Sequence, residues 1–155
     1  MKKTDDFLIN RLMWKAERYR LPTESSFYFK DLPKDLQQHL STFIDLEKSG
    51  APILFFTKST KEWTVICTRQ VICRDNKSTV TINIAEIHSI EPAAFEASLK
   101  LPLIKFRDGN HSKRDWDQLT ITDKKSNRYI LHSDKGSDLF ALWNILLMTK
   151  RILAE

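Results

Sequence analysis

The residues with the greatest chemical reactivity in this sequence are two cysteines, Cys67 and Cys73, six positions apart in the stretch EWTVICTRQVIC at 62–73. A nucleophilic thiol needs a nearby base and an electropositive pocket, whereas the flanking residues here are mainly aliphatic. Side chains alternate along a strand, so Trp63, Val65 and Cys67 share one face, and Cys73 follows on the next strand beyond a turn. We therefore predict that both cysteines are buried packing residues.

Other signals for catalysis or metal binding are weak. The four histidines lack the short paired spacing that is typical of zinc ligands; they are His39, His88, His111 and His132. None of the three glycines stands in a phosphate-binding loop. Asp115 and Asp117 flank Trp116, but this pattern is equally expected at the solvated start of a strand. We expect no catalytic residue, no metal and no cofactor, and hence a binding module in place of an enzyme.

The length and composition are those of one domain. The chain has 155 residues, of which 41% are hydrophobic and 29% charged, enough to bury a core without metal or disulfide staples. The start MKKTDDFLIN has two aspartates where a secretory signal needs an apolar run, so we expect a cytoplasmic protein with reduced cysteines. The net charge of +5 modestly favours anionic partners.

Residues 1–50 are predicted to form a helical hairpin. Thr4 is a suitable N-cap for the first helix, and apolar residues recur on one face of it at Leu8, Leu12 and Ala16. A second helix is predicted between Asp31 and Gly50.

After Pro52 the pattern changes to short runs rich in β-branched and aromatic residues, separated by polar turns, which is typical of antiparallel strands. The predicted strands are 53–57, 62–68, 70–74, 78–84, 86–91, 101–107, 116–122 and 128–132. A helix at 136–152, with Ser137 as its cap, is predicted to end the chain.

The pieces WTVICTRQVI, INIAEIHSIE and SDLFALWNILLMTKR follow this strand pattern and end in an amphipathic helix with a central tryptophan. Over residues 52–152 this order resembles the pleckstrin-homology-like (PH-like) domains, particularly the small bacterial ones. The resemblance implies an α+β fold, a PH-like antiparallel β-barrel or sandwich closed by a C-terminal helix. The N-terminal helices depart from the family pattern. We expect one compact unit in which residues 1–50 pack on a PH-like domain at 51–155.

Two surfaces are candidates for the binding role, and the first is electrostatic. In an up-and-down meander, alternate turns fall at one barrel end, which would gather seven cations on one rim: Lys58, Lys61, Arg74, Lys77, Lys124, Lys125 and Arg128. In position only, this rim resembles the basic loops with which some relatives bind phosphoinositide headgroups. Interspersed acids would weaken its field, and lysines in turns are commonly just solvated.

The second surface is a stripe on the first helix, formed by Phe7, Arg11, Trp14 and Arg18. Their spacing of i, i+4, i+7 and i+11 makes the stripe continuous, on the side opposite the main apolar face. Aromatic rings alternating with arginines are typical of interface anchors. The alternative is that this helix is sandwiched between the second helix and the barrel.

The last helix has two apolar stripes. Leu139, Trp143 and Leu146 are predicted to close the barrel. The second stripe contains Ala141, Ile145, Met148 and Ile152. An uncovered stripe of this size usually marks an interface. We expect the N-terminal hairpin to cover it, through Leu8, Leu12 and Ala16; a homodimer partner or another protein is the alternative.

These patterns favour the binding of a protein partner, and one concrete form, by analogy of size and class, is a bacterial immunity protein that neutralises a cognate toxin. Peripheral binding of anionic phospholipid headgroups is the alternative. Nucleic acid comes third, because acids interrupt the basic residues and the predicted outer strand faces lack a row of exposed aromatics.

Overall fold

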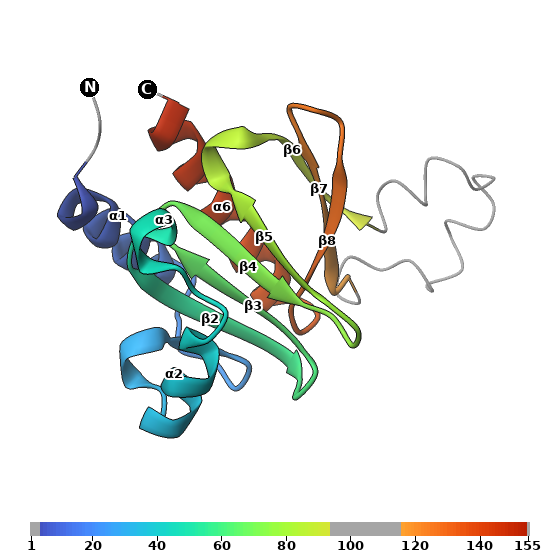
Figure 1. Cartoon of the computed structure of the whole chain (residues 1–155). Coiled ribbons are helices and arrows are strands. Elements are labelled where there is room, and N and C mark those ends of the chain that lie inside the picture. The colour runs from blue at the N-terminus through green and yellow to red at the C-terminus, as the bar shows by residue number, and fades with distance from the viewer. Residues whose placement is uncertain (1–3, 94–115, 155) are drawn as a thin grey trace.

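Two antiparallel sheets and a set of helices make up residues 4–93 and 116–154, which the computed structural model describes (Figure 1). The larger sheet has the order β1-β2-β3-β4-β5, with β1 at Ser26–Tyr28, β2 at Pro52–Ser59, β3 at Glu62–Cys67, β4 at Gln70–Arg74 and β5 at Thr79–Asn83. The smaller sheet has the order β6-β7-β8, with β6 at Ile87–Pro92, β7 at Gln118–Asp123 and β8 at Arg128–His132. The α+β class predicted from the sequence is confirmed.

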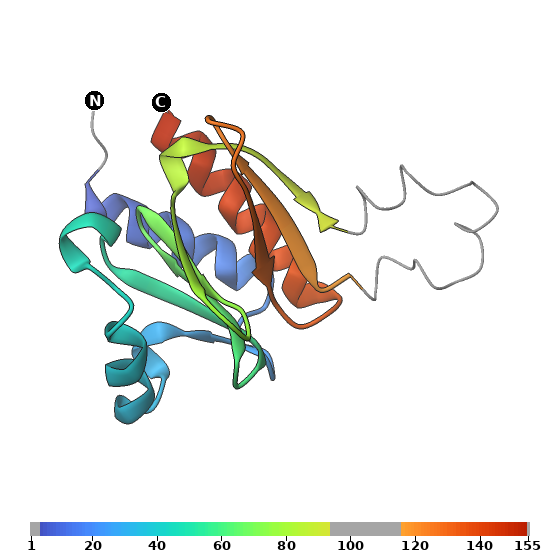
Figure 2. The same ribbon diagram turned by 45° about the vertical axis from the view of Figure 1, so that its right-hand side comes forward.

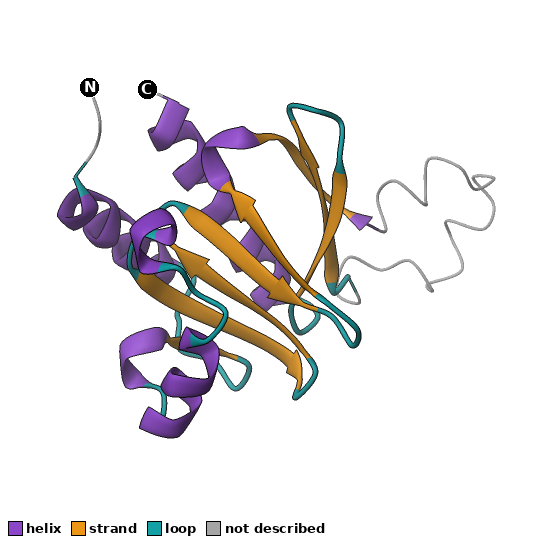
Figure 3. Cartoon of the chain, viewed as in Figure 1, coloured by secondary structure: helices purple, strands orange, loops and turns teal. Residues whose placement is uncertain are grey.

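The helices lie outside the sheets (Figure 3). They are α1 at Asp5–Arg18, α2 at Lys34–Ser41, α3 at Leu46–Ser49 and α6 at Ser137–Ala154, with 3₁₀ turns η1 at Phe29–Asp31 and η2 at Ile84–Glu86. Thr4 is the N-cap of α1, as predicted, and its hydroxyl accepts the N–H of Phe7 at 3.2 Å. None of these helices has both the length and the apolar character needed to cross a membrane.

The five-stranded sheet has an apolar core on each face. Leu54 and Phe56 of β2 face the core shared with α1, α6 and the smaller sheet. Phe55, between them, faces the second core, where the fully buried Leu40 of α2 provides cover. Since adjacent side chains of a strand point to opposite faces, the unbroken apolar run of β2 is explained by burial on both sides.

The two N-terminal helices lie on opposite faces of this sheet, so the predicted hairpin of residues 1–50 is wrong (Figures 1 and 2). The physical reason is that each apolar face needs its own cover. β1 carries the chain from one face to the other and pairs with β2, where Phe27 opposes Phe55. The predicted second helix is divided, because α2 ends at Ser41 and α3 begins only after its N-cap Asp45.

The smaller sheet and α6 complete the main core. Leu139 and Leu146 of α6 are fully buried, and the indole N–H of the half-buried Trp143 donates to the carbonyl of Ile90 on β6 at 3.1 Å. The hydroxyl of Thr64 on β3 donates to the carbonyl of His132 on β8 at 2.6 Å, which ties the two sheets together. The described strands form two separate sheets and no closed barrel.

Seven of the eight predicted strands correspond to β2–β8. The eighth, at 101–107, lies outside the described residues. Strand β1 was not predicted, because three residues are too few to show a period-2 pattern.

Candidate binding surfaces

The stripe on α1 is exposed and is built around Trp14. The side chains of Phe7 and Trp14 are 43% and 42% exposed. The guanidinium carbons of Arg11 and Arg18 lie 4.6 and 5.0 Å from the centroid of the Trp14 ring, and the ammonium nitrogen of Lys15 lies 6.0 Å from it. Cations within about 6 Å of a ring are attracted to its negative face, so the stripe is an ordered, positively charged aromatic surface.

The opposite side of α1 is buried against α6. Leu8, Leu12 and Ala16 are at most 1% exposed, and Leu12 and Ala16 belong to the same core as Ala141 and Ile145 of the second apolar stripe of α6. The prediction that the N-terminal hairpin covers this stripe is confirmed for its first helix, through Leu12 and Ala16. The alternative in which α1 is sandwiched on both sides is wrong, because α2 covers the other face of the sheet.

The seven cations predicted to form one rim lie at two opposite ends of the molecule (Figure 1). The turns from β2 to β3 and from β4 to β5 carry the first group: Lys58, Lys61, Arg74 and Lys77. The turn from β7 to β8 carries the second group: Lys124, Lys125 and Arg128. At the second end, the N–H of Lys124 donates to the carbonyl of Glu86, just before β6, at 2.9 Å.

The single-rim prediction is therefore wrong, and the reason is the order of the strands. It counted a strand at 101–107 between β6 and β7, whereas β6 pairs directly with β7. In an antiparallel meander, one strand more or less moves every later turn to the opposite end.

At the first end, two of the four cations are engaged within the chain. The ammonium group of Lys58 lies 2.9 Å from the carboxylate of Asp117. The guanidinium group of Arg74 donates to the hydroxyl of Thr79 at 2.8 Å and lies 5.3 Å from the ring centroid of Phe43. These contacts reduce the charge that this end offers to an anion.

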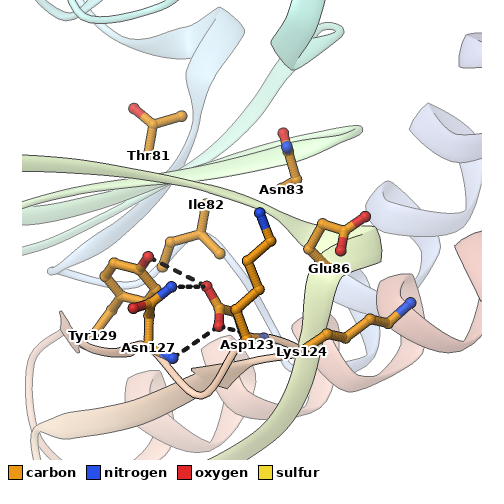
Figure 4. A pocket seen from close by; sticks show the side chains of 9 residues that line it. Thr81, Ile82, Asn83, Glu86, Asp123, Lys124, Asn127 and Tyr129 are labelled. Carbon is orange, nitrogen blue, oxygen red and sulfur yellow. Dashed lines mark hydrogen bonds between the residues drawn. The ribbon is translucent and has the colours of Figure 1, made fainter.

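At the second end, the β7–β8 turn borders a polar cavity of about 530 Å³ (Figure 4). Its lining residues are Thr81, Ile82, Asn83, Glu86, Asp123, Lys124, Lys125, Asn127 and Tyr129. The two lysines carry positive charge and the two acids negative charge, so the described lining has no net charge.

Asp123 has a structural role in this cavity. Its carboxylate accepts four hydrogen bonds of 2.9–3.3 Å: from the N–H groups of Lys125 and Asn127, the amide of Asn127 and the hydroxyl of Tyr129 (Figure 4). Desolvation raises the pKa of this carboxyl, but the hydrogen bonds from Asn127, Lys125 and Tyr129 outweigh it and lower the pKa below its ordinary value. Asp123 thus holds the turn in shape.

The two cysteines are free, buried and on opposite faces of the sheet, Cys67 in the second core and Cys73 in the main core. Burial raises the pKa of Cys67 to about 12 and also raises the pKa of Cys73. A thiol with a raised pKa is a poor nucleophile at neutral pH, so their predicted packing role is confirmed.

Among the described residues, the buried His132 has a ring nitrogen, Nδ1, without a hydrogen-bond partner. It is 6% exposed, and its Nδ1 lies 3.6 Å from the Glu62 carboxylate, too far for a hydrogen bond. Burial lowers the pKa of His132, and the nearby Glu62 opposes this shift. The described residues contain no cluster of three side chains that could hold a metal ion. Asp115 and His111 lie outside these residues.

A second cavity, of about 460 Å³, lies between α2 and the outer face of β1–β3, and the sequence did not predict it. It is lined by Phe27, Asp31, Leu32, Pro33, Leu36, His39, Phe55, Thr57, Ser59, Thr60 and Trp63. The signal that could have revealed this second apolar face is the unbroken run ILFF at 53–56, which indicates a strand with two buried sides.

Comparisons of the chain with protein-family models, with curated proteins and with solved structures found no match.

Proposed function

We propose that this protein is a non-enzymatic binding module that docks a protein partner through the α1 stripe. The observation that carries the proposal is the position of Trp14, whose half-exposed ring has the guanidinium carbons of Arg11 and Arg18 within 5.0 Å of its centroid. Trp and Arg are the residue types most enriched among interface hot spots. Since their mutual contacts already order these side chains, less conformational entropy is lost on binding.

The chemistry of the stripe defines the partner surface that would fit it. The described part of α1 has basic residues at Arg11, Lys15 and Arg18 around one exposed indole ring. A complementary surface has an apolar depression for the ring and carboxylates around it, because opposite potentials speed association and exclude wrong partners. We therefore expect an acidic protein partner.

A PH-like architecture is part of this proposal. The four strands β2–β5, the three strands β6–β8 and the C-terminal helix α6 support it, since they occur in the order that the resemblance implies. An immunity protein that neutralises a cognate toxin is the concrete form that we propose for the binding function. This form rests on analogy of size and class.

The test is co-purification of a partner from a lysate of the source organism, with quantitative mass spectrometry. The double variant Arg11→Glu/Arg18→Glu should reduce the recovered partner at least tenfold, because it reverses two charges beside Trp14. Lys34→Glu/Lys48→Glu is the matched control, with the same charge change on exposed positions of α2 and α3. Equal loss in both variants, or no loss in the first, would contradict the proposal.

Binding of anionic phospholipid headgroups is a second candidate, favoured by one observation. Lys124 and Lys125 are exposed on one turn and both line the polar cavity, whose size suits a small polar headgroup. Lys124→Glu/Lys125→Glu should then abolish sedimentation with vesicles that contain phosphatidylserine, whereas Lys61→Glu/Lys77→Glu at the other end should not. Absence of sedimentation for the unmodified protein would remove this candidate.

A further inference from the structure

The apolar cavity between α2 and the five-stranded sheet has walls that are fixed in place. On the sheet side, Phe27 and Phe55 are cross-strand neighbours with ring centroids 6.5 Å apart, and the ring of Trp63 lies 6.2 Å from Phe55. Phe55 and Trp63 are at most 5% exposed, so these rings cannot turn freely. The sheet therefore presents a preformed aromatic wall.

The opposite wall is attached to the rest of the chain by hydrogen bonds. Leu32 and Leu36 provide its apolar surface, together with Pro33. The amide of Gln37 donates to the carbonyls of Lys30 and Leu32, at 3.2 and 2.8 Å, and so ties α2 to η1. These bonds hold η1 and the start of α2 together as one unit, so this wall has a defined shape.

Of the described residues that line this cavity, one carries a fixed charge, and this charge is negative. Asp31 is exposed and is the one carboxylate among the described lining residues, while His39 is the one basic side chain. Lys34, the basic residue nearest to this wall along α2, instead lines a separate depression with Gln37 and Gln38. The lining therefore favours a ligand group that donates hydrogen bonds and is positively charged.

We propose that this cavity is a binding site for a small aromatic amine, with its ring between the aromatic wall and Leu36 and its ammonium group beside Asp31. The volume of about 460 Å³ is within the range of small-molecule sites, and mostly apolar walls with a few polar groups are typical of them. Aromatic rings also attract cations, which strengthens the preference for an amine over an acid. The site is separate from the α1 stripe, and it does not depend on the protein partner proposed above.

The experiment is a titration of the full chain, labelled with ¹⁵N, with tryptamine and with indole-3-acetate, followed by NMR. Tryptamine should produce saturable shifts of the Trp63 indole N–H and of the Phe27 and Phe55 amides. Tryptamine should bind with a Kd in the millimolar range, as is typical of a ligand with about a dozen heavy atoms. Its affinity should be at least fivefold higher than that of indole-3-acetate. Asp31→Asn should weaken the binding of tryptamine about two- to fivefold, which is the effect expected from the loss of an exposed ion pair.

Leu36→Trp fills the cavity with a larger side chain and should abolish the shifts that tryptamine causes. Leu46→Trp is the matched control, because Leu46 is 66% exposed on α3, and it should leave these shifts unchanged. Shifts that persist in the Leu36 variant, or that are absent at Trp63, would overturn the site. Equal affinity for the amine and the acid would overturn the ligand class. Occupation of the cavity by an apolar peptide but by neither probe would also overturn the proposal.

Discussion

Replacement of Thr64 by valine removes the hydroxyl that joins β3 to β8. Thr64 is fully buried, and its Oγ1 donates to the carbonyl of His132 at 2.6 Å and accepts the N–H of the same residue at 3.3 Å. Valine has nearly the same shape but can do neither. Leaving a buried polar group without a partner costs about 1–3 kcal/mol, and with about 1–1.5 kcal/mol for each of the two groups we expect a loss of about 2–3 kcal/mol.

That loss is a large fraction of the 5–15 kcal/mol by which domains are typically stable, and it corresponds to a fall in Tm of roughly 5–10 °C. Urea unfolding followed by circular dichroism measures it directly. Thr57→Val is the control, because the Thr57 hydroxyl donates to the Ser59 carbonyl at the exposed end of β2, and it should cost less than about 0.5 kcal/mol. A Thr64 variant as stable as the control would refute the reasoning that this hydroxyl ties the two sheets.

Two further predictions concern the main core and pH. Leu12→Ala should lower the free energy of unfolding, measured in urea, by about 2–5 kcal/mol, because Leu12 is 1% exposed in the core shared by α1 and α6. Leu46→Ala, at an exposed position, is the control. Equal effects of the two changes would show that α1 does not pack on α6. Burial lowers the pKa of His132 below the ordinary 6.5, so the unfolded chain binds the proton more readily, and stability should fall as the pH drops below 6.5. Between pH 7.5 and 5.5 the stability lost through His132 is at most about 1.4 kcal/mol. The variant His132→Asn should not show this loss. The same pH dependence in the variant and in the unmodified protein would contradict the role of His132.

The local elements of this fold could be predicted from the sequence, because each depends on neighbouring residues. The run EWTVICTRQVIC contains two alternating segments around a short turn, and these form most of β3 and β4, with Thr64 paired to Cys73. The face of the sheet on which a helix lies is not a local property. The pattern of α1 and the pattern of α2 each predict one apolar side, and neither indicates that two faces of one sheet need cover.

The candidate surfaces also divide into those that depend on neighbouring residues and those that depend on distant segments. The α1 stripe follows from helical spacing, and its four residues do lie along one face. The prediction of one cationic rim depended on how many strands separate the β4–β5 turn from the β7–β8 turn, and the direct pairing of β6 with β7 gives a different number from the one predicted. The apolar cavity combines Phe27 and Leu36 with Phe55 and Trp63, which come from four elements (β1, α2, β2 and β3), and β1 is too short to be predicted.

The central claim is that the α1 stripe is the docking surface, and site-specific cross-linking tests it most directly. A photoreactive residue at Asn10, exposed on α1 one turn before Trp14, leaves the stripe intact, and the same residue at Gln38, exposed on α2, is the control. After irradiation in a lysate of the source organism, we predict a covalent adduct with one acidic protein at position 10 and none at position 38. An adduct at position 38 alone, or equal yields at both positions, would contradict the claim.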